Sequence, residues 1–268
     1  AGRPLAEAGD SPAGPRHAVT LAGLLPDTLY TYRVVAGAET TAAFTFRTLP
    51  VRARPGAAAP PVTFVIYGDN RSRPEWHHRV LERIRSGPRP LFVLNTGDLL
   101  ESGPDSLGWH REFFAPGAAL FAEVPVLAVP GNHELDRSRR PRALARWWAD
   151  NLTLPANGTD GGEDRWWALR AGGGLLIGLD SNEPEAPGQR EWLAATLAAA
   201  GPDEFVIVAC HHPLYAAGGH DSDQRTRAAW RRLLDSRRVD VVFCGHNHFY
   251  QRSWPLRAGT VVSRRPSQ

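Results

Sequence analysis

Five short polar segments each follow an apolar run, and all five contain side chains of the kinds that bind metal ions. The segments are Gly68-Asp69-Asn70-Arg71, Thr96-Gly97-Asp98, Pro130-Gly131-Asn132-His133-Glu134, Cys210-His211-His212-Pro213 and Cys244-Gly245-His246-Asn247-His248. Side chains at the carboxyl ends of strands in an α/β sheet converge on one crevice, so we expect these groups to meet in space. Carboxylate oxygens and imidazole nitrogens are ligands for Zn, Fe and Mn, and the segments therefore predict a metal site.

The predicted ligand set is too large for one small cation that keeps a position open for a substrate. It comprises Asp69, Asp98, Asn132, His211, His246 and His248. Two ions, about 3.5–4 Å apart and sharing one carboxylate, fit this set better. Such a pair lowers the pKa of a bound water toward about 7 and neutralises phosphoryl oxygens. The ligand count therefore predicts a dinuclear site of the kind that supplies a metal-bound hydroxide for hydrolysis, and Fe, Zn or Mn suit its ligands.

Two of the segments are specific enough to indicate a family. Gly131-Asn132-His133-Glu134 and Gly245-His246-Asn247-His248, in this order after strands, resemble the calcineurin-like metallophosphoesterases. The β-rich lead-in resembles that of their purple acid phosphatase-like branch, and the resemblance covers about residues 17 to 255. It implies that the first metal is bound by Asp69, Asp98 and His248, and the second by Asp98, Asn132, His211 and His246, with Asp98 bridging the two.

Two positions depart from the family pattern. Many members have a His two residues after the first Asp, where this chain has Arg71. The purple branch has a Tyr three residues after the second Asp, where this chain has Glu101, so no charge-transfer colour is expected. Glu101 and His77 are therefore candidate additional ligands of the first metal. Arg71 is a candidate for bidentate binding of phosphate oxygens.

Three further histidines near these segments receive separate predictions. His133 resembles the family's uncoordinated histidine, which contacts the substrate and protonates the leaving oxygen. His220, in the loop after His211, is a candidate substrate contact. His212 adjoins a predicted ligand and is expected to face the other way.

The apolar runs and the segments between them predict an α/β fold. The runs are near-continuously apolar, as in strands buried on both faces, and cover residues 62–67, 91–95, 124–129, 175–179, 205–209 and 239–243. Helices are predicted at residues 74–85, 189–200 and 226–236. Residues 135–165 lack a clear period and are expected to form a long, partly helical excursion near the site. The resemblance implies a metallophosphoesterase-type β-sandwich flanked by helices (αββα).

Composition along the chain divides it into three parts. Residues 1–49 are expected to hold a partial fibronectin type III-like β module, with an unrelated β-meander as the alternative. Residues 50–61 form a linker rich in Pro and Ala, which predicts a semi-rigid spacer. The catalytic domain is assigned to residues 62–268 and is expected to be truncated at its C-terminus, because no clear closing strand follows.

Charge and cysteine content limit the classes of partner. The net charge is +3, from 31 basic residues and 28 acidic ones, without a basic tail or a stripe of Arg and aromatic residues that would indicate a nucleic-acid surface. No apolar run is long enough to span a bilayer. Cys210 and Cys244 are predicted to be small buried residues at strand ends, with a disulfide between them left open. The expected partner is a small phosphate ester, and the family resemblance favours an extracytoplasmic or secreted location.

Three functions remain open at this point. A phosphomonoesterase that uses the dinuclear site is the leading prediction. A phosphodiesterase or nucleotide hydrolase would use the same metals, because the substrate pocket and not the metal pair separates the two. A degenerate, non-catalytic protein that binds phosphate or glycans is the third, motivated by the ligand missing from the first metal and by the fibronectin-like lead-in.

Overall fold

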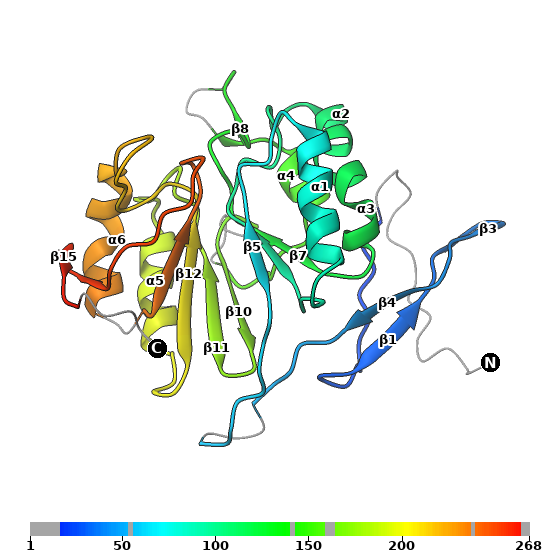
Figure 1. The fold of residues 1–268 in the computed structure, drawn as a ribbon, viewed down its shortest axis with the longest axis horizontal. Helices are drawn as coiled ribbons and strands as arrows, with labels where there is room; N and C mark the ends of the chain where they lie inside the picture. The colour runs from blue at the N-terminus through cyan, green and yellow to red at the C-terminus, as the bar shows by residue number, and fades with distance from the viewer. Residues whose placement is uncertain (1–16, 53–55, 140–142, 159–163, 237–238, 264–268) are drawn as a thin grey trace.

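Two β-sheets packed face to face form the centre of the molecule, with helices on both outer sides (Figure 1). The computed structural model describes residues 17–52, 56–139, 143–158, 164–236 and 239–263. The first sheet has the order β5-β6-β7 and is parallel, and its strands are β5 (Val65–Tyr67), β6 (Val93–Asn95) and β7 (Val126–Ala128). The layered arrangement confirms the predicted αββα fold.

The second sheet has the order β10-β11-β12-β13. Its strands are β10 (Trp167–Ala171), β11 (Gly174–Gly178), β12 (Phe205–Cys210) and β13 (Val241–Cys244). Strand β10 runs antiparallel to β11, whereas β11, β12 and β13 are parallel to one another. In β12, residues Val206 to Cys210 are buried, as their continuously apolar sequence predicts, whereas Phe205 at the start of the strand is 50% exposed.

The core between the sheets explains why their strands are apolar on both sides. Phe92, Leu94 and Leu127 from the first sheet belong to one buried cluster with Leu176 and Ile207 from the second. Because the central strands β11 and β12 also pack against helices on their outer side, polar residues on these two strands are confined to the strand ends. The site residues therefore have to lie in the loops at one edge of the sandwich.

Helices cover the outer face of each sheet. On the first sheet lie α1 (Pro74–Arg85), the short α2 (Ser106–Gly108), a π-helical segment η1 (Trp109–Phe114) and α3 (Ala115–Phe121). On the second lie α5 (Gln189–Ala198) and α6 (Gln224–Ser236), whose buried side chains pack on β11 and β12 (Figure 1). Helix α1 begins with Pro74, where the missing N–H costs nothing because a first-turn N–H has no intrahelical partner.

The long segment between β7 and β10 contains little regular structure. It holds β8 (Leu135–Asp136), β9 (Ala143–Leu144) and α4 (Trp147–Asn151) within its described residues. Trp148 is 1% exposed and packs edge-on against Trp109, with its Nε1 donating to the carbonyl of Asp164. The described part of the segment is thus packed on the core through Trp148, Leu152 and Leu154, in keeping with the predicted excursion.

The N-terminal strands form two short antiparallel pairs beside α3. Strand β1 (Leu29–Tyr32) pairs with β4 (Phe44–Arg47), and β2 (Val35–Ala36) pairs with β3 (Glu39–Thr40). The Tyr32 hydroxyl donates to the Ala122 carbonyl at 2.6 Å, which fixes this ribbon to the C-terminal end of α3 (Figure 1). A fibronectin-like module remains a prediction, and its residues 1–16 lie outside the described part of the chain.

The first residues of the predicted linker, Pro50 to Arg52, contact the second sheet and the loop before β12. The Gly172 N–H donates to the Pro50 carbonyl at 2.7 Å, Val51 forms a bridge with Gly172, and Arg52 Nη2 donates to the Asp203 carbonyl at 3.1 Å. These contacts anchor the described part of this segment to the β10–β11 turn and the loop before β12.

After β13 the chain forms a hairpin of β14 (Leu256–Arg257) and β15 (Thr260–Val261). The expected truncation of the domain at its C-terminus stays a prediction, and residues 264–268 lie outside the described part of the chain. Across the described residues, no helix has the length and apolar character that a bilayer crossing requires.

Candidate metal centre

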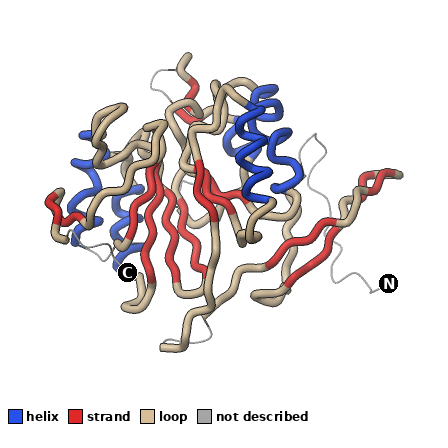
Figure 2. Tube along the Cα trace, in the orientation of Figure 1, coloured by secondary structure: helices blue, strands red, loops and turns tan. Residues whose placement is uncertain are grey.

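All five polar segments lie at the same edge of the sandwich. Strands β5, β6 and β7 are parallel in one sheet, as are β12 and β13 in the other, and each of them leads directly into one segment. Figure 2 shows loops gathered above the upper ends of both sheets, which is where these segments lie. The convergence predicted from the strand-end positions is therefore what the fold produces.

Tight backbone turns aim the side chains into this edge. Asp69, Asp98 and His246 adopt positive φ angles of 55°, 57° and 70°, a left-handed region that is uncommon for residues with a Cβ. Such strained positions gather at functional sites because the surrounding structure has to hold them there. Here these positions closely follow the ends of β5, β6 and β13, where the predicted ligands come together.

The glycines before the ligands are required by close contacts. A Cβ on Gly97, whose φ is +98°, would lie 2.7 Å from the Gly131 nitrogen and 2.7 Å from His211 Nδ1. A Cβ on Gly245 would lie 2.7 Å from Asp69 Oδ2. The pattern of a glycine preceding a polar ligand thus reflects how tightly the loops pack against one another.

One side of the cleft is dominated by carboxylates, and we call Asp69, Asp98 and His248 the carboxylate side. Asp98 is 2% exposed, and its Oδ1 lies 3.4 Å from His211 Nε2. Ligand atoms of Asp69, Asp98 and His211 all lie within 4.8 Å of one another. The His248 side chain is half exposed, with its Nε2 3.5 Å from Asp69 Oδ1. Both oxygens of Asp69 also accept from the His246 N–H at 3.0 Å.

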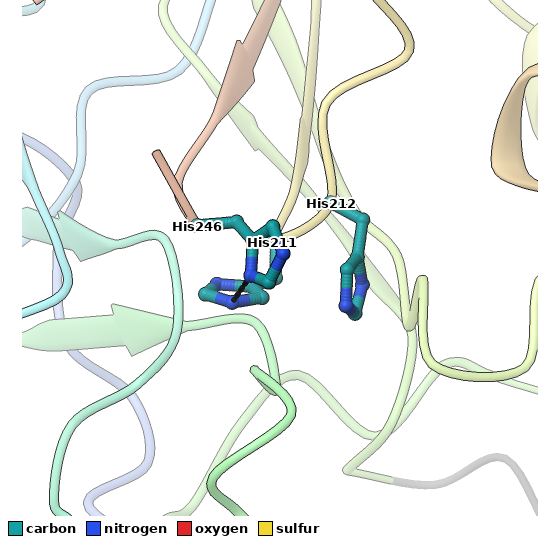
Figure 3. Close-up of side chains that lie close together, drawn as sticks. All are labelled: His211, His212 and His246. Carbon is teal, nitrogen blue, oxygen red and sulfur yellow. Dashed lines mark hydrogen bonds between the residues drawn. The ribbon is translucent and has the colours of Figure 1, made fainter. Parts of the chain in front are cut away.

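The opposite side is built from imidazoles and one amide, and we call Asn132, His211, His212 and His246 the histidine side. Figure 3 shows the three rings gathered together, with the hydrogen bond between His211 Nε2 and His246 Nδ1 at 3.2 Å. His211 Nδ1 lies 2.8 Å from the Thr96 carbonyl, so this nitrogen carries the proton and Nε2 presents its lone pair. Asn132 Oδ1 lies 3.2 Å from the same Nε2.

The expectation that His212 faces away from the cleft is wrong. Its ring centroid lies 4.6 Å from that of His246, and its ligand atom lies within 4.8 Å of those of His211 and His246. The Ser181 hydroxyl, 2.9 Å from His212 Nδ1, helps to hold the ring in place. The alternation of side chains along a strand applies only within β12, which ends at Cys210, and both histidines belong to the turn that follows.

Burial sets the charge of these groups. Burial raises the pKa of Asp69 to about 7, helped by repulsion from Asp98. Burial lowers the pKa of His211 to about 3 and that of His246 to about 4, with the neighbouring histidines adding to the effect on His246. Burial alone would raise the pKa of Asp98, but attraction to His211, the His133 N–H and Arg71 together hold it below its ordinary value. At neutral pH both imidazoles are therefore neutral and able to act as ligands.

A buried carboxylate that received no predicted role ties two ligand loops together. Glu134 is 0% exposed, and its oxygens accept from the N–H groups of Asp98 and Leu99, both at 2.9 Å, and of Gly131 at 2.7 Å. Asn182 supports the same loop, because its Nδ2 donates to the Gly131 carbonyl at 3.1 Å. Glu134 is the last residue of the segment Gly131-Asn132-His133-Glu134, and this position beside two predicted site residues is the sequence feature that could have indicated its role.

Two candidate ligands of the first metal lie apart from the groups that gather. His77 is 2% exposed, with its Nδ1 2.9 Å from the Glu112 carbonyl and its ring stacked on Phe113. The carboxylate of Glu101 pairs with Arg71 Nη1 at 2.7 Å and accepts from the Ser72 hydroxyl. The His77 ring is therefore engaged on the buried side of helix α1, and the Glu101 carboxylate is engaged by Arg71 and Ser72 at the cleft rim.

The three candidate catalytic residues surround the metal ligands. His133 is 9% exposed, its Nδ1 lies 2.7 Å from the Glu101 carbonyl, and its Nε2 lies 3.9 Å from Asp98 Oδ2. Arg71 Nε lies 3.3 Å from the same Asp98 oxygen. The exposed His220 stacks on His246 with ring centroids 4.4 Å apart. His133 and Arg71 thus lie beside Asp98, and His220 lies against His246.

Comparison with known proteins decides the family. The family model described as "Calcineurin-like phosphoesterase" matches residues 57–250, which is well over half of the chain. This chain belongs to the calcineurin-like phosphoesterase family. The match includes all five polar segments and ends two residues after His248.

Similar sequences within this family include bacterial and plant proteins. The "Uncharacterized protein Rv2577" of Mycobacterium tuberculosis is 27% identical over 287 residues, covering 91% of this chain and 52% of its own length. "Probable purple acid phosphatase 20" of Arabidopsis thaliana is 27% identical over 247 residues, covering 87% of this chain and 54% of its own length. The chain thus spans about half the length of the curated relatives it matches.

Solved structures show the same calcineurin-like fold. The purple acid phosphatase PPD1 from yellow lupin superposes with a TM-score of 0.67 at 18% identity, over 93% of this chain and 49% of that one. The structure titled "Structure of PhoD" gives a TM-score of 0.60 at 15% identity, over 86% of this chain and 59% of that one. At these identities the likeness supports the fold alone.

The donor atoms of this calcineurin-like cleft fit metal ions. His211 Nε2 faces Asn132 Oδ1 at 3.2 Å and Asp98 Oδ1 at 3.4 Å, and none of these three atoms has a proton to donate to another. Acceptor atoms crowded in this way are stabilised by a cation placed among them. Neutral imidazole nitrogens and carboxylate oxygens together suit Zn, Fe or Mn.

Proposed function

We propose that this chain is the catalytic part of a metal-dependent phosphoester hydrolase, and more specifically a phosphomonoesterase. The observation that carries the proposal is the position of Asp98, which lies within 3.4 Å of His211 and within 3.3 Å of Arg71 at the centre of the cleft. A carboxylate in this position lies between the predicted metal ligand His211 and the proposed substrate contact Arg71. Membership of a phosphoesterase family supports the same conclusion.

The predicted ligands would hold the metals in this cleft. Those residues are Asp69, Asp98, Asn132, His211, His246 and His248. When bound, two such ions supply Lewis acidity toward a phosphoryl group and lower the pKa of a bound water. Asp98, which would be one of the residues that hold the metals, is itself held in place because its Oδ1 accepts from the backbone N–H of His133 at 3.0 Å while its own backbone N–H donates to Glu134 at 2.9 Å.

His133 is placed to give a proton to the leaving alkoxide. Its Nδ1 is 2.7 Å from the Glu101 carbonyl, an acceptor, so Nδ1 carries a proton and the ring is held in one orientation. This leaves Nε2 directed toward Asp98 Oδ2, where a proton on it would face the reacting group. A general acid held in this way contributes about 10²- to 10⁴-fold to the rate.

Arg71 and His220 are proposed to contact the substrate. Arg71 is partly buried beside Asp98, so its guanidinium faces the position of a phosphate and offers paired N–H donors. The backbone N–H of His220 donates to Asn247 Oδ1 at 2.7 Å, which helps to hold the His220 ring over that of His246. It would bound the substrate pocket on the histidine side.

Hydrolysis of an aryl phosphate by the metal-loaded parent protein tests the proposal. We expect turnover that disappears with chelation, and a loss on the order of 10³-fold in Asp98→Asn. Unchanged turnover in Asp98→Asn would overturn the proposal. A chain that binds phosphate but hydrolyses nothing would support the non-catalytic alternative instead.

The choice between mono- and diesters requires a direct comparison of substrates. We expect the aryl phosphate monoester to be turned over faster than the corresponding diaryl phosphate, because Arg71 adds a fixed positive charge for a dianionic group. A higher kcat/KM for the diester would assign the site to a phosphodiesterase or nucleotide hydrolase.

A further inference from the structure

The two sides of the cleft differ in what they offer a cation. The histidine side presents neutral nitrogens and an amide oxygen, and its three histidine ligand atoms lie within 4.8 Å of one another. The carboxylate side has Asp69, which is engaged by the His246 N–H, and His248, whose side chain is 54% exposed. The third carboxylate-side ligand, Asp98, already carries an ion pair on its Oδ2 atom.

That ion pair comes from Arg71, at the position where many family members have a histidine. Its Nε lies 3.3 Å from Asp98 Oδ2, and its Nη1 lies 2.7 Å from Glu101 Oε2. The Arg71 N–H also donates to the Asp98 carbonyl at 3.3 Å. The guanidinium is thus fixed between two carboxylates on the carboxylate side.

The loop that carries Arg71 is itself held in place. Asn70 Nδ2 donates to the Leu99 carbonyl at 2.8 Å, and its Oδ1 accepts from Asn95 Nδ2 at 2.7 Å. These contacts anchor the backbone beside Arg71, while the ion pairs with Asp98 and Glu101 hold its guanidinium in the cleft. A guanidinium carries a positive charge and offers no lone pair to a metal ion.

We propose that Arg71 supplies the positive charge that a cation would otherwise bring to the carboxylate side. One metal ion binds tightly, on the histidine side, and a second binds at least about tenfold more weakly because it must approach a fixed like charge. A substrate phosphate would then lie between one metal and the guanidinium. The inference rests on the metal site of the proposed function and is independent of whether that site hydrolyses esters.

Zinc binding by the chelator-stripped full-length protein tests the inference. Protein equilibrated with Zn²⁺ and then desalted is analysed for zinc per chain, and calorimetric titration gives the two affinities. We expect the wild type to retain one zinc ion and Arg71→His, which removes the charge and adds a ligand, to retain two. Arg71→Ala, which removes only the charge, should tighten the second site about tenfold or more.

Two controls separate charge and ligand effects from general disturbance. Arg71→Lys keeps a positive charge in the cleft and should retain one zinc ion, as the wild type does. Arg79→His makes the same replacement on the exposed face of α1, where the guanidinium packs over Trp76 at 4.7 Å, and should leave zinc content unchanged. Melting temperatures of the stripped variants check that each one folds.

Two results would overturn the inference. The first is a wild type that retains two zinc ions of similar affinity. The second is a folded Arg71→Ala in which the second affinity equals that of the wild type. Activity tests the proposed function separately. A protein that retains one zinc ion and hydrolyses no ester supports this inference and contradicts the proposed function. A protein that retains two zinc ions of similar affinity and hydrolyses the ester contradicts this inference and supports the proposed function.

Discussion

The histidine side and the carboxylate side of the cleft are built from the same kind of strand-end loop, yet they offer different environments. On the histidine side, burial keeps His211 and His246 neutral, with pKa values of about 3 and 4, so lone pairs face the cleft. On the carboxylate side, Arg71 pairs with Asp98. The identity of the ligands in the sequence therefore does not fix the metal affinity of a site. A neighbouring charge, such as that of Arg71 beside Asp98, also changes the affinity of the ligands for a cation.

The largest expected effect comes from removing His211, at the centre of the histidine side. His211→Ala should abolish tight metal binding and reduce aryl phosphate hydrolysis at least about 10³-fold, since a direct ligand contributes more than the 10- to 100-fold of outer partners. Metal content and kcat/KM measure the effect. The matched variant His248→Ala, on the half-exposed carboxylate side, should keep one metal ion. Equal losses in both variants would contradict the difference between the two sides.

The pH dependence of the stripped protein tests the burial of the carboxylate side. Burial and the nearby Asp98 raise the folded-state pKa of Asp69 from 3.8 to about 7. The unfolded chain therefore loses its proton first, and the stabilisation present below pH 3.8 is lost as pH rises through about 7. The Asn side chain of Asp69→Asn does not titrate. Above that pH, the free energy of unfolding of this variant should therefore exceed that of the wild type by up to about 4 kcal/mol.

Urea unfolding of both chelator-treated proteins at acidic and at mildly alkaline pH measures this difference in free energy. The difference between the two proteins isolates Asp69, because the histidines titrate in both. A gap that stays constant across the pH range would show that Asp69 is ionised in the folded state throughout.

Glu134 supports both sides, because its carboxylate joins the loop of Asp98 to the loop of Asn132. Glu134→Gln replaces one acceptor oxygen by an amino group facing N–H donors, which leaves buried donors unpaired at about 1–3 kcal/mol each. We expect a loss of about 2–3 kcal/mol in the free energy of unfolding. Glu101→Gln, at the exposed rim, is the control and should lose less than about 1 kcal/mol. Equal losses would remove the special role of Glu134.

The smallest expected effect concerns His220, which lies on the surface of the histidine side. His220→Ala removes a ring stacked at 4.4 Å on His246 but no ligand. Loss of the proposed contact between this ring and the substrate, at about 0.5–1.5 kcal/mol, should raise KM by about 2- to 10-fold while metal content stays constant. Steady-state kinetics and metal analysis together separate this result from a loss of ligation.

Much of the fold follows from local patterns. All six predicted apolar runs contain a strand, and the predicted helix at residues 74–85 coincides with α1. Strand β10 (Trp167–Ala171) was missed because Arg170 and two alanines interrupt its apolar character at the sheet edge, where one side faces solvent. The helical stretch from α2 to α3 was missed because Gly108, Pro116 and Gly117 weaken its helix propensity, which packing on α1 overrides.

The sequence by itself determined which residues end the strands, and with them the convergence of Asp69, Asp98 and His211, because parallel strands bring their carboxyl ends to one edge. Tertiary structure alone decided the orientation of each side chain beyond that point. His212 turned inward, and His77 became part of a buried aromatic cluster. Arg71 came to pair with Asp98, which lies 27 positions further along the chain. Turn geometry and ion pairing depend on neighbours brought together by folding, and no local pattern encodes them.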